Sequence, residues 1–560
     1  MDWLSGILKS EPELALFAAL SAGYLLGRVK VKGFSLGGVA GSLIAALVIG
    51  QLGIELPDSL KAVCFALFIY SIGFKSGPEF FGGLNRSSIK LVVSSVVHCL
   101  AALVVVLTIA HVCHFGKGFT AGLGAGALTQ TAMMGTAGGA LTRLGLPPDQ
   151  VNQLIGQMAV GFAITYIFGT VGVIVFVRSI APRLMGVDVR KAARDLEVEL
   201  SEGGPVTRPG FITPFVPVVA RAFKVDKAAK RTISQIEDRF DRASIERVVR
   251  GEEAMEKTAD LVLKAGDIVG VSGRLPSVVA AGELIGDEVE SKEALSFPMK
   301  VVTAVLTNKR LLGKTLRQVR DSFTEEERQG VYVSSFKRQG LPMPILLKTT
   351  VRRGDVFELA GRPDEVDRIA NELGYAESAD GKSDLAFHAA AIVAGILFGL
   401  LSVTVGGIPV TLGVGGGVLV SGLCFGWIHA RYPIFGAMPQ PAQWILSEFG
   451  LSAFAAAVGL SAGPKAIVAV QQQGVALLIA GAAVTIVPLF VALFFGRFVL
   501  KLHPVVLLGA LAGGQTVAAA LSAANEETES VTPVLGFTVT YAISNVLLAV
   551  WGPVIVALSK

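Results

Sequence analysis

Residues 118–141 read GFTAGLGAGALTQTAMMGTAGGAL, and residues 505–525 read VVLLGALAGGQTVAAALSAAN. Both stretches lack Asp, Glu, Lys and Arg, and each contains one Gln-Thr pair. Irregular backbone is tolerated at membrane depth where it lines a cavity, and glycine permits such backbone. We therefore expect both stretches to be re-entrant hairpins, which enter the bilayer and return to the same side.

The composition is that of a polytopic membrane protein. Of the 560 residues, 52% are hydrophobic and 17% are charged, whereas an ordinary soluble domain is about 25% charged. The 65 glycines suit helices that pack closely in lipid. A net charge of +5 is small for this length and argues against nucleic acid as a partner. The four cysteines form no CxxC pair, so neither a zinc site nor a disulfide framework is expected. No cofactor and no other metal site is expected.

Charge divides the chain into two apolar halves around a charged middle. Apolar stretches of about 20 residues are long enough to span a bilayer. The predicted parts are membrane half 1 at 1–186, a linker at 187–207, two small modules at 208–290 and 291–378, and membrane half 2 at 379–560.

The two apolar halves repeat each other in the same order at nearly one displacement along the chain, which predicts a duplicated core typical of transporters. The matching segments are Gly73-x-x-x-Gly77-Pro78 with Gly459-x-x-x-Gly463-Pro464, Gln130-Thr131 with Gln515-Thr516, and Gly161-Phe162-x-x-Thr165-Tyr166 with Gly536-Phe537-x-x-Thr540-Tyr541.

Positive charges predict the number of crossings, because Lys and Arg concentrate on the cytoplasmic side. Basic clusters follow the first, third and last spans of half 1: Arg28, Lys30 and Lys32; Lys75, Arg86 and Lys90; Arg178, Arg183 and Arg190. Five crossings plus one re-entrant hairpin place all three clusters inside, whereas six simple crossings cannot. An odd number of crossings makes the two repeats inverted. Both termini are then expected outside, with the middle part cytoplasmic.

The charged middle part is itself a tandem repeat. Lys264-Ala-Gly266-Asp267 and Arg352-Arg-Gly354-Asp355 each precede an alternating strand pattern and then a helical pattern. A Gly-Asp pair before alternating residues is typical of a turn into a strand. We expect two small α+β modules here.

The middle modules resemble the C-terminal domain of the regulator of potassium conductance, the TrkA-C type. The flanking halves resemble the aspartate:alanine exchanger family of bacterial transporters, on the segment Ile72 to Phe81, its echo Val458 to Pro464, and the paired Gln-Thr hairpins. The resemblance implies electrogenic exchange of small carboxylates, aspartate against alanine, across the bacterial inner membrane. It also leaves open export of dicarboxylates such as succinate. Such modules commonly pair and bind small ligands, so a homodimer and an unidentified ligand on the modules are expected.

The predicted hairpin tips are the first choice for substrate contact. A carboxylate inside the membrane needs hydrogen-bond donors and positive potential, and the N-termini of broken helices supply both. Gln130, Thr131, Gln515 and Thr516 are therefore the leading candidates. The alternative is that they are polar contacts between packed helices.

Lys75 is a second candidate, with Ser461 at the matching place in the other half. Gly73, Gly77 and Pro78, like Gly459, Gly463 and Pro464, are expected to break their helices. A cation beside such a break could balance the extra carboxylate of aspartate. The alternative is a lysine that extends to the cytoplasmic face.

Thr165 and Thr540, with the tyrosines that follow them, are weaker candidates for substrate contact. His98 lies within a predicted span, and an ionisable residue there is a functional hypothesis by default. The bland alternative is a neutral histidine bonded to a neighbouring helix.

Two other functions are weighed against the exchanger. A cation–proton antiporter usually needs acidic residues in its membrane core, and the charge-free stretches contain none. An intramembrane enzyme needs paired acids, a metal cluster or a Ser–His arrangement, and only Ser94 and Ser95 near His98 approach this.

Overall fold

A computed structural model describes the chain except residues 1, 32–33, 36, 55, 84–87, 202–217, 240–242, 329, 339, 377–381, 406–407, 412 and 433. The described residues form two compact units. The membrane unit comprises 1–195 and 381–560, and the middle unit comprises 196–380.

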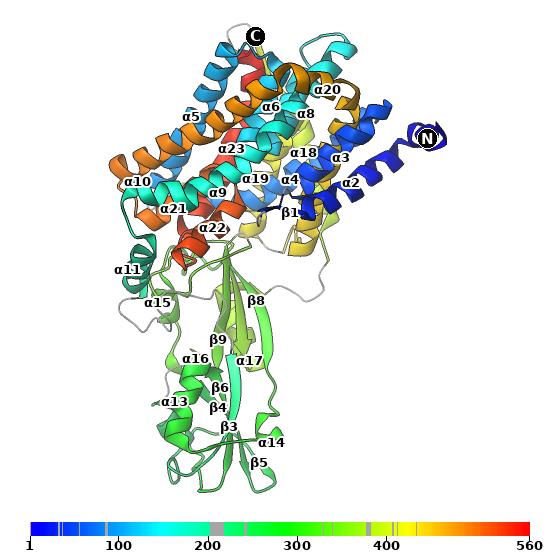
Figure 1. The fold of residues 1–560 in the computed structure, drawn as a ribbon. Helices are drawn as coiled ribbons and strands as arrows, with labels where there is room; N and C mark the ends of the chain where they lie inside the picture. The colour runs from blue at the N-terminus through cyan, green and yellow to red at the C-terminus, as the bar shows by residue number, and fades with distance from the viewer. Residues whose placement is uncertain are drawn as a thin grey trace. The chain divides into compact units, whose positions relative to one another are not determined.

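A similar order of elements occurs twice in the membrane unit, except that α1 has no counterpart and the single helix α20 takes the place of α4 and α5 (Figure 1). The first half contains α1 (Asp2–Ser10), α2 (Pro12–Arg28), β1 (Lys30–Val31), β2 (Phe34–Ser35), α3 (Gly38–Ile49), α4 (Asp58–Gly83), α5 (Ile89–Val112), α6 (Lys117–Ala127), α7 (Thr131–Leu141) and α8 (Pro148–Ile167), which continues through π-helical turns and α9 (Val173–Val175) to α10 (Ala181–Met185). The second half contains α18 (Leu385–Leu400), β13 (Ser402–Val405), β14 (Ile408–Thr411), α19 (Gly413–Arg431), α20 (Gln440–Phe494), α21 (Pro504–Gly514), α22 (Ala518–Thr528) and α23 (Val534–Leu558).

Seven stretches of helix among the described residues are long and apolar enough to cross a membrane. They are Asp58–Gly82, Ile89–Val112, Pro148–Met185, Gly413–Arg431, Gln440–Gly463, Gln473–Val499 and Val534–Leu558. The polytopic membrane fold is therefore confirmed, but five full-length crossings per half are not. Helices α2, α3 and α18 have 17, 12 and 16 residues. Two-stranded hairpins, β1–β2 and β13–β14, take up part of the apolar sequence beside them.

The expectation that the Gly-Pro motifs break their helices is wrong. Helix α4 continues through Pro78, and α20 is one α-helix of 55 residues that contains Gly459, Gly463 and Pro464. Membrane helices tolerate proline when neighbouring groups satisfy the freed carbonyl. The glycines instead permit close helix packing, the usual role of a GxxxG motif.

At these glycines the helices of one half pack closely against helices of the other half. A Cβ on Gly73 would lie 2.6 Å from the carbonyl oxygen of Leu419, so α4 packs directly on the backbone of α19. A Cβ on Gly459 would lie 2.8 Å from Cβ of Ala46, and one on Gly463 would lie 2.6 Å from Cα of Gly50. The contact of α20 with α3 is thus equivalent to the contact of α4 with α19. In each contact, a glycine-containing helix of one half packs against a helix of the other half.

The middle unit contains two five-stranded antiparallel sheets with the same strand order. The first sheet, in the order β5-β4-β6-β3-β7, is built from β3 (Val218–Lys224), β4 (Ala243–Arg250), β5 (Glu253–Met255), β6 (Ile268–Arg274) and β7 (Glu288–Val289). The second, in the order β10-β9-β11-β8-β12, is built from β8 (Lys300–Leu306), β9 (Val331–Arg338), β10 (Leu341–Pro342), β11 (Val356–Gly361) and β12 (Gly374–Ala376). Each sheet carries one 11-residue helix, α13 (Leu275–Ile285) or α17 (Pro363–Leu373). The sheet-containing middle region is confirmed.

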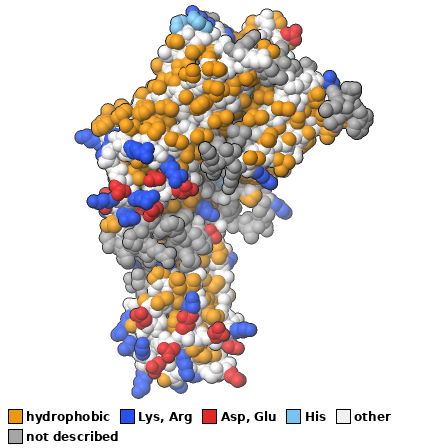
Figure 2. Space-filling view, viewed as in Figure 1, with side chains coloured by type: hydrophobic (Ala, Val, Ile, Leu, Met, Phe, Trp, Pro, Cys, Tyr) orange, Lys and Arg blue, Asp and Glu red, His pale blue; other side chains and the backbone are white. Residues whose placement is uncertain are grey.

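The surface of the membrane unit agrees with a lipid environment. Hydrophobic side chains cover the sides of its helices in Figure 2, and charged side chains gather at one end, near α10 and α22. There Arg178 lies 3.6 Å from a carboxylate oxygen of Glu527, and Arg190 lies 3.2 Å from one of Glu529. Exposed apolar sides with charges at the end are expected of a protein that spans a bilayer.

Candidate functional site

Both glycine-rich stretches fold as pairs of short helices with a tight turn between them. Helices α6 and α7 form hairpin 1, and α21 and α22 form hairpin 2; each of the four helices has 11 residues. The turns have the same backbone, because Thr129 and Thr516 both adopt positive φ, 52° and 57°. Their N–H groups donate to Gly126 O at 2.9 Å and Gly513 O at 3.0 Å.

This geometry corrects the alignment of the two Gln-Thr pairs. In the backbone, Thr129 corresponds to Thr516, so Gln130 corresponds to Val517 and Leu128 to Gln515. An alignment that pairs Gln130-Thr131 with Gln515-Thr516 is therefore shifted by two residues from the alignment of the two backbones. The four residues still lie at the two tips.

The two tips contact each other reciprocally. The hydroxyl of Thr129 donates to the carbonyl oxygen of Gln515 at 3.0 Å, and that of Thr516 lies 3.5 Å from the carbonyl oxygen of Leu128. Because these are equivalent pairs, the contact has an approximate two-fold symmetry. Gln130, Thr131 and Gln515 are buried, with 3%, 5% and 0% of their surface exposed.

The hairpins approach this contact from opposite ends of α23. At the base of hairpin 1, Lys117 donates to the carbonyl oxygen of Val556 at 2.8 Å, near the C-terminal end of α23. At the base of hairpin 2, Gly509 packs on the backbone of Pro533, which immediately precedes α23. Figure 1 shows α6 toward the C-terminus of the chain, with α21 and α22 at the other end of α23. At 1.5 Å per residue, the 25 residues of α23 measure about 37 Å, enough to cross a bilayer.

Thr165 and Thr540 hold the hairpins by packing. A Cβ on Gly126 would lie 2.6 Å from Phe162 O, and Thr165 Oγ1 would be closer still. A Cβ on Gly513 meets Phe537 O and Thr540 Oγ1 in the same way. Both threonines are fully buried and donate to carbonyl oxygens of their own helices, so their described contacts are those of packing residues.

Hairpin 1 is fixed by two polar residues that the sequence analysis missed. Gln130 Nε2 donates to Asn545 Oδ1 on α23 at 3.2 Å, and Thr485 Oγ1 on α20 donates to Ala127 O at 2.9 Å. The available signal was a lone asparagine in the apolar stretch 530–559. For Thr485 no sequence signal exists, because its partner is a main-chain carbonyl far away in the sequence.

Hairpin 2 is held differently. Gln515 Nε2 donates to the carbonyl oxygen of Thr485 at 3.1 Å, while Gln515 Oε1 has no hydrogen-bond partner among the described residues. His98 on α5 lies against Gly514 and close to the Gln515 side chain and the Pro488 backbone, but neither ring nitrogen makes a hydrogen bond of normal geometry with a described residue. Unpaired polar atoms therefore gather on the side of hairpin 2.

Lys75 and Ser461 are not brought to the tips by any described contact. The Lys75 side chain is exposed on α4, and Ser461 Oγ donates to Ala457 O of its own helix at 3.1 Å. Exposure agrees with a lysine that extends toward the membrane surface.

The Gly-Asp motifs of the middle unit form matching ion pairs in which the carboxylate is buried. Asp355 receives two hydrogen bonds of 2.7 Å from the guanidinium of Arg338, and Asp267 receives two of 2.9 Å from Arg250. Burial opposes ionisation of Asp267, but the Arg250 guanidinium and the Lys264 N–H outweigh it, so the pKa of this carboxyl is lowered. Each Gly-Asp motif thus supplies the carboxylate of one ion pair.

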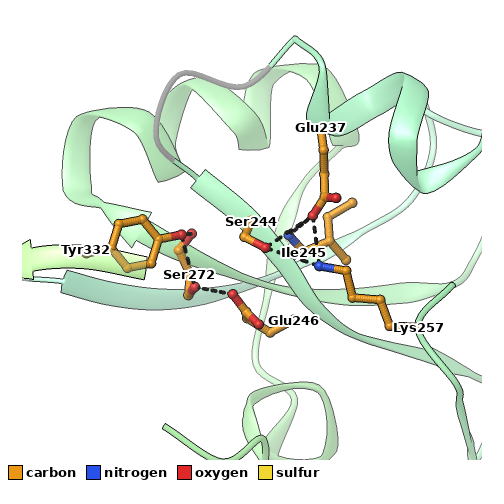
Figure 3. Close-up of polar contacts among 7 residues, drawn as sticks. All are labelled: Glu237, Ser244, Ile245, Glu246, Lys257, Ser272 and Tyr332. Atoms are coloured by element: carbon orange, nitrogen blue, oxygen red, sulfur yellow. Dashed lines mark hydrogen bonds and ion pairs between the residues drawn. The ribbon is translucent and has the colours of Figure 1, made fainter. Parts of the chain in front are cut away.

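A polar cluster joins the two sheets of the middle unit (Figure 3). Tyr332 of the second sheet donates to Ser272 O of the first at 3.0 Å, and Ser272 Oγ donates to Glu246 at 2.6 Å. Nearby, Glu237 accepts from the N–H of Ile245 at 2.7 Å and lies 3.1 Å from Lys257 Nζ. Burial raises the pKa of the Tyr332 phenol, so it remains a neutral donor.

Comparison with known proteins assigns the membrane unit to a class. The family model Asp-Al_Ex, described as a predicted permease membrane region, matches residues 15–182 and 387–557. These two ranges contain both hairpins and omit the middle unit. No solved structure matches the chain.

Full-length relatives carry names of the same class. An uncharacterized transporter of Bradyrhizobium diazoefficiens is 43% identical, covering 100% of this chain and 99% of the relative. Uncharacterized transporters of Zymomonas mobilis and Bordetella parapertussis are 40% and 39% identical, each covering 100% of this chain and 100% and 98% of the relatives. The similarity therefore includes the middle unit.

Proposed function

The chain belongs to the Asp-Al_Ex family of predicted permeases, and on that premise we propose that it is a secondary active transporter that exchanges small carboxylates, aspartate against alanine, at the contact of its two hairpin tips. It is not an enzyme, because its family is a permease family and its relatives are named transporters. The substrate pair and the exchange mechanism are parts of the proposal.

One observation carries the proposal: the reciprocal contact of Thr129 with Gln515 and of Thr516 with Leu128, between hairpins that approach from opposite ends of α23. Secondary transporters built from inverted repeats bind substrate near the bilayer midplane, between discontinuous helices. The helices α7 and α22 start at this contact, so their first N–H groups and positive dipole ends are available to a carboxylate.

Burial of Gln130, Thr131 and Gln515 supports alternating access. Thr129 and Thr516 are only half-buried, and we propose that substrate reaches the buried groups when one hairpin separates from its neighbours. Because the hairpins approach from opposite ends, movement of hairpin 1 would open the site to one side and movement of hairpin 2 to the other. We place the middle unit in the cytoplasm of a bacterial cell and the protein in the inner membrane, as the basic clusters predict.

The proposed exchange differs from a neutral exchange in that it moves net charge across the membrane. Aspartate carries one more negative charge than alanine, so each turnover transfers one charge, worth about 2.3 kcal/mol per 100 mV. We also propose, on its positive charge alone, that Lys75 favours aspartate, since no described contact brings it to the tips. Substitution of Lys75 by Ala is expected to reduce aspartate transport more than alanine transport.

The test is counterflow into proteoliposomes that contain the purified full-length protein. Vesicles loaded with unlabelled aspartate should accumulate labelled aspartate or alanine, empty vesicles should not, and an imposed potential should change the initial rate. Protein-free vesicles control for leakage.

Two results would change the assignment. Rapid flux of labelled succinate without aspartate flux would identify a dicarboxylate transporter of the same family. Absence of flux for aspartate, alanine and succinate, with protein of verified fold, would contradict the proposed function.

A further inference from the structure

The two hairpins share one backbone but have unequal polar contacts. The displacement along the chain that relates Thr129 to Thr516 also relates Ala127 to Gly514, and it relates His98 on α5 to Thr485 on α20. Thr485 and His98 therefore occupy equivalent places beside the two hairpins. The comparison between them is internal to the molecule and depends on no other protein.

Thr485 makes a hydrogen bond to hairpin 1, and the symmetry predicts a similar bond from His98 to hairpin 2. Its hydroxyl donates to the carbonyl oxygen of Ala127 at 2.9 Å, at the end of the first helix of hairpin 1. Gly481 O also lies 2.9 Å from the same hydroxyl, so the two carbonyl oxygens share its single proton. Hairpin 1 is thus attached to α20 with its polar groups paired.

His98 occupies the equivalent place at hairpin 2 without an equivalent bond. A Cβ on Gly514 would lie 3.3 Å from Cγ of His98, so the ring packs closely against this glycine. The ring is 1% exposed, and the Gln515 side chain and the Pro488 backbone lie close enough to interact with it. These approaches lack hydrogen-bond geometry, so no described residue satisfies Nδ1 or Nε2 in this conformation.

Gln515 adds a second unpaired group at the same place. Its Nε2 donates to Thr485 O, which fixes the orientation of the amide, so that Oε1 is the free end. Gln515 is fully buried, and Oε1 has no partner in the described structure. Buried polar groups are normally paired, and leaving them unpaired costs free energy.

The free groups define what would pair with them. A neutral imidazole has one N–H donor and one acceptor nitrogen, and Gln515 Oε1 accepts only. A ligand that complements them presents an acceptor to the imidazole N–H and a donor to the amide oxygen. An α-amino acid carries both, as an ammonium and a carboxylate group on the same carbon, whereas a dicarboxylate lacks the donor.

We propose that His98 is a specificity-determining residue of the transport site, and that His98 and Gln515 together bind the amino-carboxyl head of the substrate. The imidazole N–H donates to the carboxylate, and Gln515 Oε1 accepts from the ammonium group. Hairpin 2 is the hairpin whose polar contacts are completed by substrate. This inference rests on the proposed function, because it requires transport through the hairpin contact.

The competing explanation is a structural histidine whose ring contributes packing or a bond to Gln515. The two explanations predict opposite effects on the ligand-free protein. Replacing an unpaired buried imidazole by an apolar side chain removes a desolvation cost, whereas removing a structural hydrogen bond leaves a partner unsatisfied.

The experiment compares three variants of the full-length protein: His98→Leu, His98→Gln and the control His388→Leu. His388 is a buried histidine of α18 that is paired, with Nδ1 2.7 Å from the hydroxyl of Tyr70. Thermal unfolding is measured without substrate and with L-aspartate, and counterflow gives KM and Vmax for aspartate and succinate.

We expect His98→Leu to unfold at or above the wild-type temperature and to raise KM for aspartate about tenfold or more, the loss of one hydrogen bond to a charged group. KM for any succinate flux should change less, and His98→Gln, which keeps a donor and an acceptor, should retain part of the affinity for aspartate. His388→Leu should lower the unfolding temperature. The ligand-induced rise in unfolding temperature should be smaller in His98→Leu than in wild type.

Two results overturn the assignment in different ways. If wild type transports aspartate and His98→Leu destabilises the protein with KM unchanged, His98 is structural and only this inference fails. If wild type shows no counterflow and no ligand-induced stabilisation with aspartate, alanine or succinate, the proposed function fails and this inference fails with it.

Discussion

The middle unit and the membrane unit each contain a duplicated element, and the copies differ in what they retain. In the middle unit both sheets keep an Arg–Asp pair with a buried carboxylate and the same bidentate geometry, Arg250 with Asp267 and Arg338 with Asp355. In the membrane unit both hairpins keep the backbone turn and the glycine packing but not the polar side chains beside them. A structural role is the same in both copies, whereas a substrate that is not symmetric requires unequal copies.

The largest effect is expected from the ion pairs. Asp355→Asn leaves Arg338, which is 3% exposed, without its charge partner, and breaking such a pair costs about 3–5 kcal/mol. Asp267→Asn should cost less, because 27% of the Arg250 side chain is exposed and water can solvate it. Hydrogen exchange of the sheet amides in the full-length protein measures both losses.

The control for this prediction is Asp367→Asn. Asp367 pairs with Lys300 at the surface, where the two side chains are 44% and 45% exposed, and such pairs are worth at most about 1 kcal/mol. Equal loss of protection in all three variants would show that the pairs do not have the structural role assigned to them.

The glycine packing of the hairpins should be equally sensitive in both copies. Gly126→Ala and Gly513→Ala each place a Cβ 2.6 Å from a carbonyl oxygen of the neighbouring helix, and overpacking of this kind costs about 1–3 kcal/mol. Unfolding temperature and counterflow should fall in both variants. Gly139→Ala, on α7 with no atom within 4 Å of the new Cβ, is the matched control. If Gly126→Ala or Gly513→Ala had the same unfolding temperature and counterflow as Gly139→Ala, the symmetric packing would be contradicted.

Thr485→Val should weaken hairpin 1 alone. It removes the hydroxyl that donates to Ala127 O and leaves a buried acceptor unsatisfied, a loss of about 1 kcal/mol. Thr165→Val is the control, because the hydroxyl of Thr165 donates only within its own helix, to Gly161 O. The measurement is the alkylation rate of a cysteine placed at Thr129, which should rise only with Thr485→Val. Equal rates in the two variants would mean that Thr485 does not hold hairpin 1.

The smallest effect is a dependence of the middle unit on pH. The pKa of Asp267 is lowered in the folded protein, so its contribution is present above the unfolded pKa of about 3.9 and is lost as pH falls through the folded value. Acidification below about pH 4 should therefore reduce the protection of the β4 and β6 amides from hydrogen exchange in the wild type. The same acidification should affect the Asp267→Asn variant less. Parallel loss in both proteins would assign the acid sensitivity to other groups.

The sequence predicted the elements that depend on composition and local pattern. Glycine-rich, charge-free stretches marked both hairpins, and the repeated Gly-Asp turn marked both sheets. The helix breaks at Gly73–Pro78 and Gly459–Pro464 were predicted wrongly, because the same glycines serve to pack helices. Local sequence does not distinguish the two roles until the partner helix is known.

Contacts between segments that are distant in the chain could not be predicted from the sequence. Identity of the Gln-Thr pairs suggested a register that the backbone places two residues away, since Thr129 and Thr516 share the positive φ. The bond from Thr485 to Ala127 joins residues whose pairing follows from the packing of α20. His98 was recognised as unusual, but only its position against Gly514 distinguishes it from an ordinary buried histidine.

The central claim, that substrate binds where the two tips meet, is tested most directly by substrate protection of single cysteines. Thr129→Cys, Thr516→Cys and the exposed control Gly139→Cys are made in a protein whose Cys64, Cys99, Cys113 and Cys424 are replaced by Ala. Maleimide labelling is measured against aspartate concentration. The account predicts that aspartate slows labelling at both tips, with half-protection at the counterflow KM, and leaves Gly139→Cys unchanged. Unaltered labelling of both tip cysteines at a saturating concentration of transported aspartate would contradict it.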